Sequence, residues 1–347
     1  MTPSSSLLLG RWLLLGVVMV VVQIWLGGVT RLTGSGLSIP QWDLIMGTIP
    51  PLNTQQWEEA FEKYKMFPQY RLLNADMELN GFKRIYWWEY IHRLWGRLLA
   101  IAFLVPLLWF LWKQLIPRRL LLQLVGLFAL GALQGLLGWI MVASGLVDRP
   151  WVDPLKLALH LLLALLLLSL LFLLAMLYLK PGAQAEHPTL QRFGIALLIL
   201  LSIQFFFGGL MAGYKAGLLY PTFPRIGTHW IPPGIWSLKP WWLNFLENTV
   251  AIHTFHRLLG YLIAFVALIG CARMYSTARN RTQRLALLML SALVVAQVLL
   301  GILTVVHALG QIPLLWASAH QMVGVLLWLC VIWLVCLSRR PALSTHA

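Results

Sequence analysis

The sequence predicts an all-α integral membrane protein whose eight transmembrane helices form two pseudo-symmetric four-helix bundles. Three observations support this fold class: a very apolar composition, eight long apolar runs and an internal repeat. Of the 347 residues, 60% are hydrophobic and 11% are charged. A soluble domain carries about 25% charged residues, so the surface of this chain must face lipid. The composition excludes a soluble enzyme and a disordered protein.

Each apolar run is long enough to cross a bilayer, which takes about 20 mainly apolar residues in a helix. In chain order the runs cover residues 12–30, 90–112, 120–143, 157–179, 192–212, 250–272, 284–306 and 315–338. The connections between them are short except for 31–89 and 213–249. The first run ends in Gly-Gly-Val-Thr-Arg at residues 27–31, without a small-x-small cleavage pattern, so we expect a retained helix.

Lysine and arginine gather at the two termini and in the loops after the second, fourth and sixth runs, where Glu186 is the single acid. Loops rich in Lys and Arg stay on the cytoplasmic side. We therefore expect both termini in the cytoplasm and both long loops outside. The net charge of +15 is then a sign of membrane topology, and no nucleic-acid partner is expected. The three cysteines all lie within apolar runs, so no disulfide is expected outside the membrane.

The second half of the chain repeats the first. Four pairs of segments match, namely 23–28 with 204–209, 92–96 with 256–260, 134–138 with 297–301, and 158–160 with 318–320. We assign residues 1–180 to a first bundle and 181–347 to a second. Each unit has an even number of spans, so both copies insert with the same orientation, as in parallel-repeat transporters.

Four histidines occupy equivalent places near the outer ends of the even-numbered runs. They are His92, His160, His256 and His320, and the residues four positions later are Gly96, Ala164, Gly260 and Gly324. Residues four apart share a helix face, so each imidazole lies beside a patch with almost no side chain, which suits a flat macrocycle. Zinc or copper would need carboxylate or thiolate ligands nearby, and none cluster here. One bis-histidine haem site per bundle is predicted; the alternative is helix contacts through histidine and small residues.

The halves differ one turn before the first of these histidines. Glu89 precedes His92 by three residues, and the matching residue in the second half is His253. A carboxylate beside an axial ligand can accept protons or stabilise positive charge; alternatively it pairs with Arg93 or Arg97. This asymmetry favours chemistry in the first half and a permanent, electron-transferring haem in the second.

Three arginines near the outer boundary are further candidates for binding. Arg93, Arg97 and Arg257 could bind haem propionates or extend to lipid headgroups. In the second half His253 competes with His256 as the ligand, and His256 is favoured because it keeps the His-Arg-Leu-x-Gly pattern of the first half.

The first outer loop contains an amphipathic segment. Trp57, Phe61 and Tyr64 recur at helical spacing among charged residues, which predicts a helix lying on the membrane over the first bundle. This helix could limit the access of water to the site, or it could simply pack against the first bundle.

Several longer motifs together resemble haem A synthases of the type found in mitochondria and many Gram-negative bacteria. The resemblance covers residues 12–338 and is carried by Gly27–Leu37, Pro50-Pro51 to Trp57, Phe67-Pro68-x-Tyr70, Asn74-x-x-Met77, Glu89-x-x-His92-Arg93-x-x-Gly96-Arg97, Gln134–Trp139, Glu247-Asn248 and His256-Arg257. Other branches of the family carry a cysteine pair in the first outer loop, which this chain lacks. His253 stands where relatives are expected to have glutamine.

The resemblance implies an inner-membrane enzyme that oxidises the C8 methyl of haem O to a formyl group, giving haem A for cytochrome oxidase. Two successive hydroxylations and loss of water from the resulting gem-diol would form the aldehyde. It further implies that His256 and His320 ligate a haem b, while His92 and His160 hold haem O with Glu89 at the reacting edge. Haem O synthase and oxidase assembly factors are the implied partners. The alternatives are a quinone-linked di-haem electron-transfer protein and a haem carrier.

Overall fold

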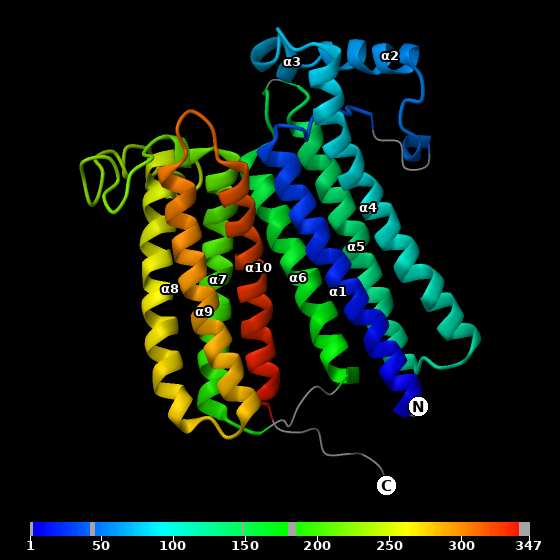
Figure 1. The fold of residues 1–347 in the computed structure, drawn as a ribbon, viewed down its shortest axis with the longest axis vertical. Helices are drawn as coiled ribbons and strands as arrows, with labels where there is room; N and C mark the ends of the chain where they lie inside the picture. The colour runs from blue at the N-terminus through cyan, green and yellow to red at the C-terminus, as the bar shows by residue number, and fades with distance from the viewer. Residues whose placement is uncertain (1–2, 42–45, 148, 180–184, 340–347) are drawn as a thin grey trace. The chain divides into compact units, whose positions relative to one another are not determined.

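The computed structural model describes residues 3–41, 46–147, 149–179 and 185–339. Regular structure in these ranges is helical apart from one isolated bridge between Ile226 and His229. Eight of the helices are long and apolar enough to cross a membrane, which confirms the predicted class and number of spans (Figure 1).

The spanning helices are α1 (Pro3–Leu32), α4 (Leu79–Trp112), α5 (Arg118–Ser144), α6 (Pro154–Leu179), α7 (Pro188–Gly213), α8 (Thr249–Thr277), α9 (Arg281–Val306) and α10 (Leu314–Leu337). The first outer loop holds η1 (Met46–Thr48), α2 (Thr54–Lys65) and α3 (Pro68–Leu73), and the second holds η2 (Ala216–Leu218) and η3 (Trp241–Phe245). Three helices begin with an asparagine cap, whose side chain accepts hydrogen bonds from backbone N–H groups of the first turn. These caps are Asn53 of α2, Asn248 of α8 and Asn280 of α9.

The second spanning helix begins at Leu79, well before the apolar run that starts at residue 90. This extension is amphipathic, with Lys83 and Arg84 beside buried Phe82 and Tyr86. Because polar and apolar residues alternate here, the apolar pattern begins only at residue 90, although the helix already begins at Leu79. α2 and α3 lie beside this extension, at the end of α4 where the helix begins (Figure 1).

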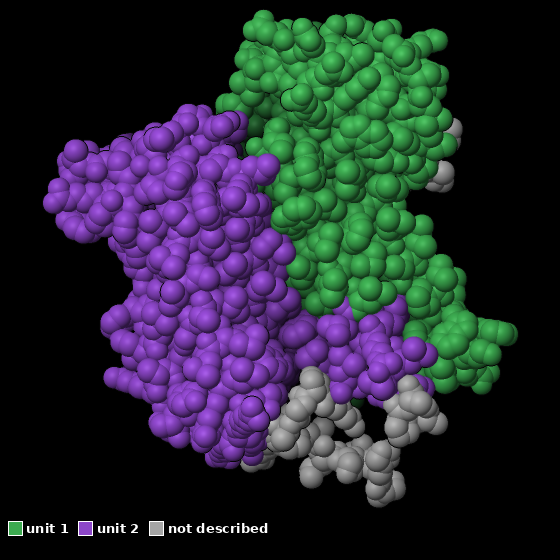
Figure 2. Space-filling model, in the orientation of Figure 1, with its two compact units in different colours: residues 1, 15–168 green, residues 2–14, 169–347 purple. Residues whose placement is uncertain are grey.

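The chain divides into two compact units (Figure 2). One contains residues 15–168 with residue 1, and the other contains residues 2–14 and 169–347. In the second unit α7 packs against α8 and α10, and α9 packs against the same two helices, which closes a four-helix bundle. The boundary predicted from the repeat, between residues 180 and 181, lies outside the described residues.

Candidate functional site

Each of the four histidines lies against a glycine on a neighbouring helix. A Cβ built on Gly27 of α1 would be 3.1 Å from His92 Nε2, and one on Gly208 of α7 would be 3.4 Å from His256 Cε1. The equivalent distance to Cε1 is 3.0 Å for Gly138 and His160, and 3.0 Å for Gly301 and His320. Distances of 3.0–3.4 Å are tighter than ordinary contacts, so the glycine allows each ring its close approach.

The space beside each imidazole is therefore left by a glycine on the neighbouring helix, and not by a residue on the histidine's own helix. The glycines four positions after His92, His256 and His320 instead face glutamines. Gln23 Nε2 lies 3.6 Å from a Cβ built on Gly96, and Gln204 Nε2 lies 3.3 Å from one on Gly260. The four glycines that face the rings lie in repeated segments of the sequence, but no role beside the rings was predicted for them; each follows a glutamine by four residues. That recurring spacing is the signal that could have identified them.

The four histidines form two pairs, one in each unit. His92 and His160 are near neighbours in the first unit, and His256 and His320 are near neighbours in the second. Within the described residues no group of three or more His, Cys, Asp or Glu side chains could hold a metal ion. Two imidazoles without a third protein ligand suit a haem, whose ring supplies the other iron ligands. The buried Nδ1 atoms of His160 and His256 have no hydrogen-bond partner in the structure.

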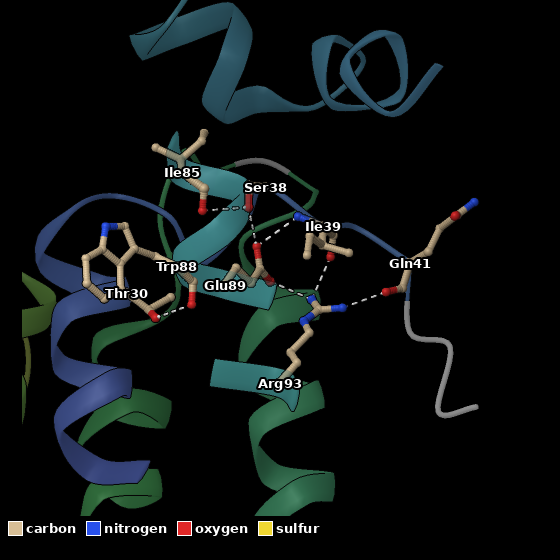
Figure 3. A network of polar contacts seen from close by, with 8 residues as sticks. All are labelled: Thr30, Ser38, Ile39, Gln41, Ile85, Trp88, Glu89 and Arg93. Atoms are coloured by element: carbon tan, nitrogen blue, oxygen red, sulfur yellow. Dashed lines mark hydrogen bonds and ion pairs between the residues drawn. The ribbon is translucent and has the colours of Figure 1, made fainter. Parts of the chain in front are cut away.

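Glu89 lies in a polar network that joins the start of the first outer loop to α4 (Figure 3). Its side chain is buried, and its Oε2 accepts hydrogen bonds from Ser38 Oγ at 2.7 Å and Ile39 N at 2.8 Å. Its Oε1 accepts from Arg93 Nη2 at 2.6 Å. The structure thus forms the Glu89–Arg93 ion pair that the sequence left as an alternative. Three donors hold this carboxylate in place.

The two arginines that follow a histidine in the repeat hold the outer loops. Arg93 donates to the carbonyl oxygens of Ile39 at 2.6 Å and Gln41 at 2.7 Å (Figure 3). Arg257 donates to the carbonyl oxygens of Thr222 at 2.9 Å and Pro224 at 2.7 Å. In both units the guanidinium joins the loop after the unit's first helix to the helix that carries the histidine.

Arg97 lies one turn beyond Arg93 on α4. Arg93, Tyr90 and Tyr86 are its electrostatic neighbours, so a second guanidinium lies in this region of the first unit. An anionic group placed here would be attracted to both guanidinium groups.

His253 occupies the place of Glu89 in the second unit, but it makes different contacts. The side chain is fully buried, its ring lies 6.2 Å from that of Tyr220, and it lies close to the backbone of Ala216. Within the described residues His256 lies against a helix glycine, and no such contact is found for His253. The two rivals therefore have different surroundings, and the choice of His256 as the ligand stays a prediction.

The predicted amphipathic helix exists as α2, and its apolar face packs on α4. Trp57, Phe61 and Tyr64 form one buried cluster with Phe82 and Tyr86. This face therefore contacts protein, whereas the sequence had suggested that it lies on the membrane. Burial raises the pKa of Tyr64 to about 12, so the hydroxyl stays protonated at neutral pH.

The Tyr64 hydroxyl links this cluster to the loop that holds Glu89. It donates to Gln69 Oε1 at 3.0 Å, and Gln69 Nε2 donates to the carbonyl oxygen of Gly34 at 2.9 Å. Asn74 Nδ2 donates to the same hydroxyl at 2.7 Å. The cluster and the Glu89 network therefore belong to one connected outer structure.

Comparison with known proteins connects this architecture to one family. The family described as cytochrome oxidase assembly protein matches residues 10–332. A protein of Nitrosospira multiformis named "Heme A synthase" is 41% identical over 326 residues, which cover 93% of this chain and 91% of the relative. Proteins of the same name from Bradyrhizobium diazoefficiens and Methylorubrum populi are 42% and 45% identical, over 93% and 92% of this chain and 89% and 85% of theirs. The chain belongs to the COX15-CtaA family of cytochrome oxidase assembly proteins, the haem A synthases.

Proposed function

We propose that this protein is a haem A synthase, a multi-pass membrane oxidoreductase that converts haem O to haem A. The observation that carries the proposal is the pair of histidines in each unit, with each ring against a glycine of a neighbouring helix, in a chain that aligns with proteins of that name over most of its length. An enzyme that modifies a haem with the help of another haem needs two such sites, and the two units supply one each.

In the second unit His256 and His320 are proposed to hold a resident haem b. Both rings belong to the closed bundle of α7 to α10, and each lies against a helix glycine. When bound, this group supplies one-electron transfer. The two histidines hold it in place, and the apolar helices around them exclude water.

In the first unit His92 and His160 are proposed to bind the iron of the substrate, haem O. Conversion of its C8 methyl to a formyl group breaks two C–H bonds, so a proton acceptor near the reacting carbon is useful. Glu89 lies one turn from His92, and an ionised carboxylate has about four acceptor positions, of which the three donors above occupy three. Ser38 Oγ also lies 3.4 Å from the carbonyl oxygen of Ile85, so its hydroxyl keeps an acceptor when Glu89 takes a proton.

Arg93 and Arg97 are proposed to attract the substrate's propionates toward the outer end of the first unit. Arg93 already makes three hydrogen bonds to the protein, so its role toward a ligand is mainly electrostatic. Arg257, with its guanidinium directed to loop carbonyls, has the same role in the second unit.

The orientation proposed from the charges is an inner-membrane protein with cytoplasmic termini. The histidines then lie near the outer surface, and α2, α3 and the long loop of the second unit lie outside. Haem O synthase and oxidase assembly factors remain proposed partners.

The test is production of haem A in cells that make haem O and have no other haem A synthase. Extracted haems are identified by mass for the wild-type chain, His92→Ala and His307→Ala; His307 is an exposed histidine in the outer connection between α9 and α10. We expect haem A from the wild type and from His307→Ala, and unconverted haem O from His92→Ala. Haem O that persists beside a folded, haem-loaded wild-type protein would contradict the proposal and favour an electron-transfer protein or a haem carrier.

A further inference from the structure

A glutamine accompanies each histidine in the same geometric relation. Each of the four lies one turn before the glycine that faces the ring, and its carboxamide lies near the backbone of the helix that carries the histidine. They are Gln23 on α1, Gln134 on α5, Gln204 on α7 and Gln297 on α9. In three of the four pairs the carboxamide faces the glycine four residues after the histidine; Ala164 stands at this place in the remaining pair.

Three of these glutamines make the same hydrogen bond to a helix backbone. Nε2 donates to the carbonyl oxygen of the histidine, at 3.2 Å from Gln23 to His92, 3.0 Å from Gln134 to His160, and 3.0 Å from Gln204 to His256. Each bond joins two neighbouring helices at the level of the imidazole. It therefore fixes how far the histidine helix is shifted and rotated against its partner.

Three carboxamides also lie near the ring. The distance from the carboxamide Nε2 to the imidazole Nε2 is 3.3 Å for Gln134 and His160, and 3.5 Å for both Gln204 with His256 and Gln297 with His320. In the fourth pair the ring also contacts the partner backbone. His320 Nδ1 lies 3.0 Å from the backbone carbonyl oxygen of Gln297. A carbonyl oxygen can only accept, so Nδ1 carries the proton and Nε2 keeps its lone pair. In the structure that lone pair is directed at the carboxamide nitrogen of Gln297, 3.5 Å away, which a bound iron would replace. The ring can approach this carbonyl because Gly301, one turn later on α9, has no side chain.

Packing alone does not account for the four glutamines. A polar side chain within a spanning helix is expensive and usually functional, and here it recurs beside all four histidines. The chain also offers a contrast in Gln283, which is fully buried on α9. Gln283 Nε2 donates to the carbonyl oxygens of Ala185 and Leu337, and it lies at the other end of α9, far along the helix from the histidines.

We infer that the Gln-x-x-x-Gly segments at residues 23–27, 134–138, 204–208 and 297–301 are positioning elements for the four iron ligands. The glutamine fixes the helix pair, the glycine admits the ring, and the imidazole is presented in one orientation. Groups that orient a metal-bound histidine tune both affinity and electronic properties, and their loss costs about 10- to 100-fold in metal affinity. This inference rests on the proposed function, because it concerns the ligands of the proposed haem sites.

The experiment uses the full-length protein purified with its haem b and compares Gln204→Met with Gln283→Met. Methionine keeps the length of glutamine and removes the donor. We expect Gln204→Met to shift the low-spin EPR signal of the haem and to release haem at least tenfold faster to an apo-globin acceptor. Gln283→Met should lower the thermal midpoint and leave the EPR signal unchanged.

Two further variants keep the test decisive if Gln204→Met does not fold. Gly301→Ala places a Cβ 3.0 Å from His320 Cε1 and should also shift the haem b signal. Gly131→Ala is its control, since nothing lies within 4 Å of a Cβ built on Gly131. The inference is overturned if Gln204→Met and Gly301→Ala keep the wild-type EPR signal, or if Gln283→Met shifts it equally.

Failure of this inference can be told apart from failure of the proposed function. If His256→Ala and His320→Ala still bind haem b with the wild-type signal, the ligand assignment itself is wrong. If both lose the signal while Gln204→Met and Gly301→Ala retain it, only the positioning role is wrong.

Discussion

Glu89 has two separable tasks in this structure. Its carboxylate holds the segment around Ser38 and Ile39 against α4, and it pairs with Arg93. The ion pair is nearly buried, with side-chain exposures of 3% for Glu89 and 13% for Arg93. Removing one partner of a buried pair leaves an uncompensated charge and costs about 3–5 kcal/mol. Loss of activity in Glu89→Ala would therefore not prove a chemical role.

Glu89→Gln and Ser38→Ala probe those tasks, and the haem-to-protein ratio checks the fold because Glu89→Gln also leaves Arg93 without its ionic partner. The glutamine keeps the shape and one acceptor oxygen but cannot take up a proton, whereas Ser38→Ala removes a single hydrogen bond, worth about 1 kcal/mol, and leaves the carboxylate. We expect Glu89→Gln to retain haem b and lose haem A formation, and Ser38→Ala to keep most of its turnover. Both are measured by the mass of extracted haems and by the haem-to-protein ratio. Unchanged turnover in Glu89→Gln would show that the residue is purely structural.

At the scale of elements, α2 and the start of α4 form a folded structure outside the spans. Phe82 is fully buried, and its ring centroid lies 5.1 Å from that of Phe61 and 5.3 Å from that of Tyr64. The Gln69 bond to Gly34 continues this structure toward the Glu89 network. α2 therefore supports the loop that positions the carboxylate.

Phe82→Ala tests this supporting role. Truncation of a buried phenylalanine costs about 3–5 kcal/mol, which is roughly a 100-fold or greater rise in the locally open population. We expect faster tryptic cleavage after Lys63 and Lys65, reduced haem A formation and unchanged haem b. The matched control is Leu72→Ala on α3, since Leu72 is 62% exposed. Wild-type cleavage rates in Phe82→Ala would mean that α2 is held by other contacts.

Some elements could be predicted from the sequence, whereas the helix extension at 79–89 and the glycines beside the rings could not, for physical reasons. Spans are visible because lipid requires about 20 apolar residues in a row, and α2 is visible because its apolar residues share one face. The extension at 79–89 was missed because a helix that packs on protein on one side and meets water on the other has no such run. The glycines facing the rings were missed because periodicity describes one helix, while their role depends on which helix lies opposite.

At the scale of the whole molecule, the two copies of the repeated unit differ in how their outer loops are held. In the first unit Glu89, Ser38 and Arg93 hold the loop through a charged network. In the second unit Leu219 stands in the place of Ser38 and His253 in the place of Glu89, and the loop is held by Arg257. The Gln, Gly and His frame is kept in both. The shared frame would account for the two proposed haem sites, and the different surroundings would account for their different proposed tasks.

This division predicts which half retains which haem. His256→Ala and His320→Ala should be purified without haem b, because each removes one of two axial ligands. His92→Ala and His160→Ala should retain haem b with its wild-type spectrum and fail to form haem A, because the ligands they remove belong to the other unit. The measurement is the haem-to-protein ratio with the optical and EPR spectra of each purified variant. Loss of haem b in His253→Ala together with its retention in His256→Ala would show that the ligand is His253, one turn earlier on α8. Loss of haem b in His92→Ala would show that the two sites are not independent.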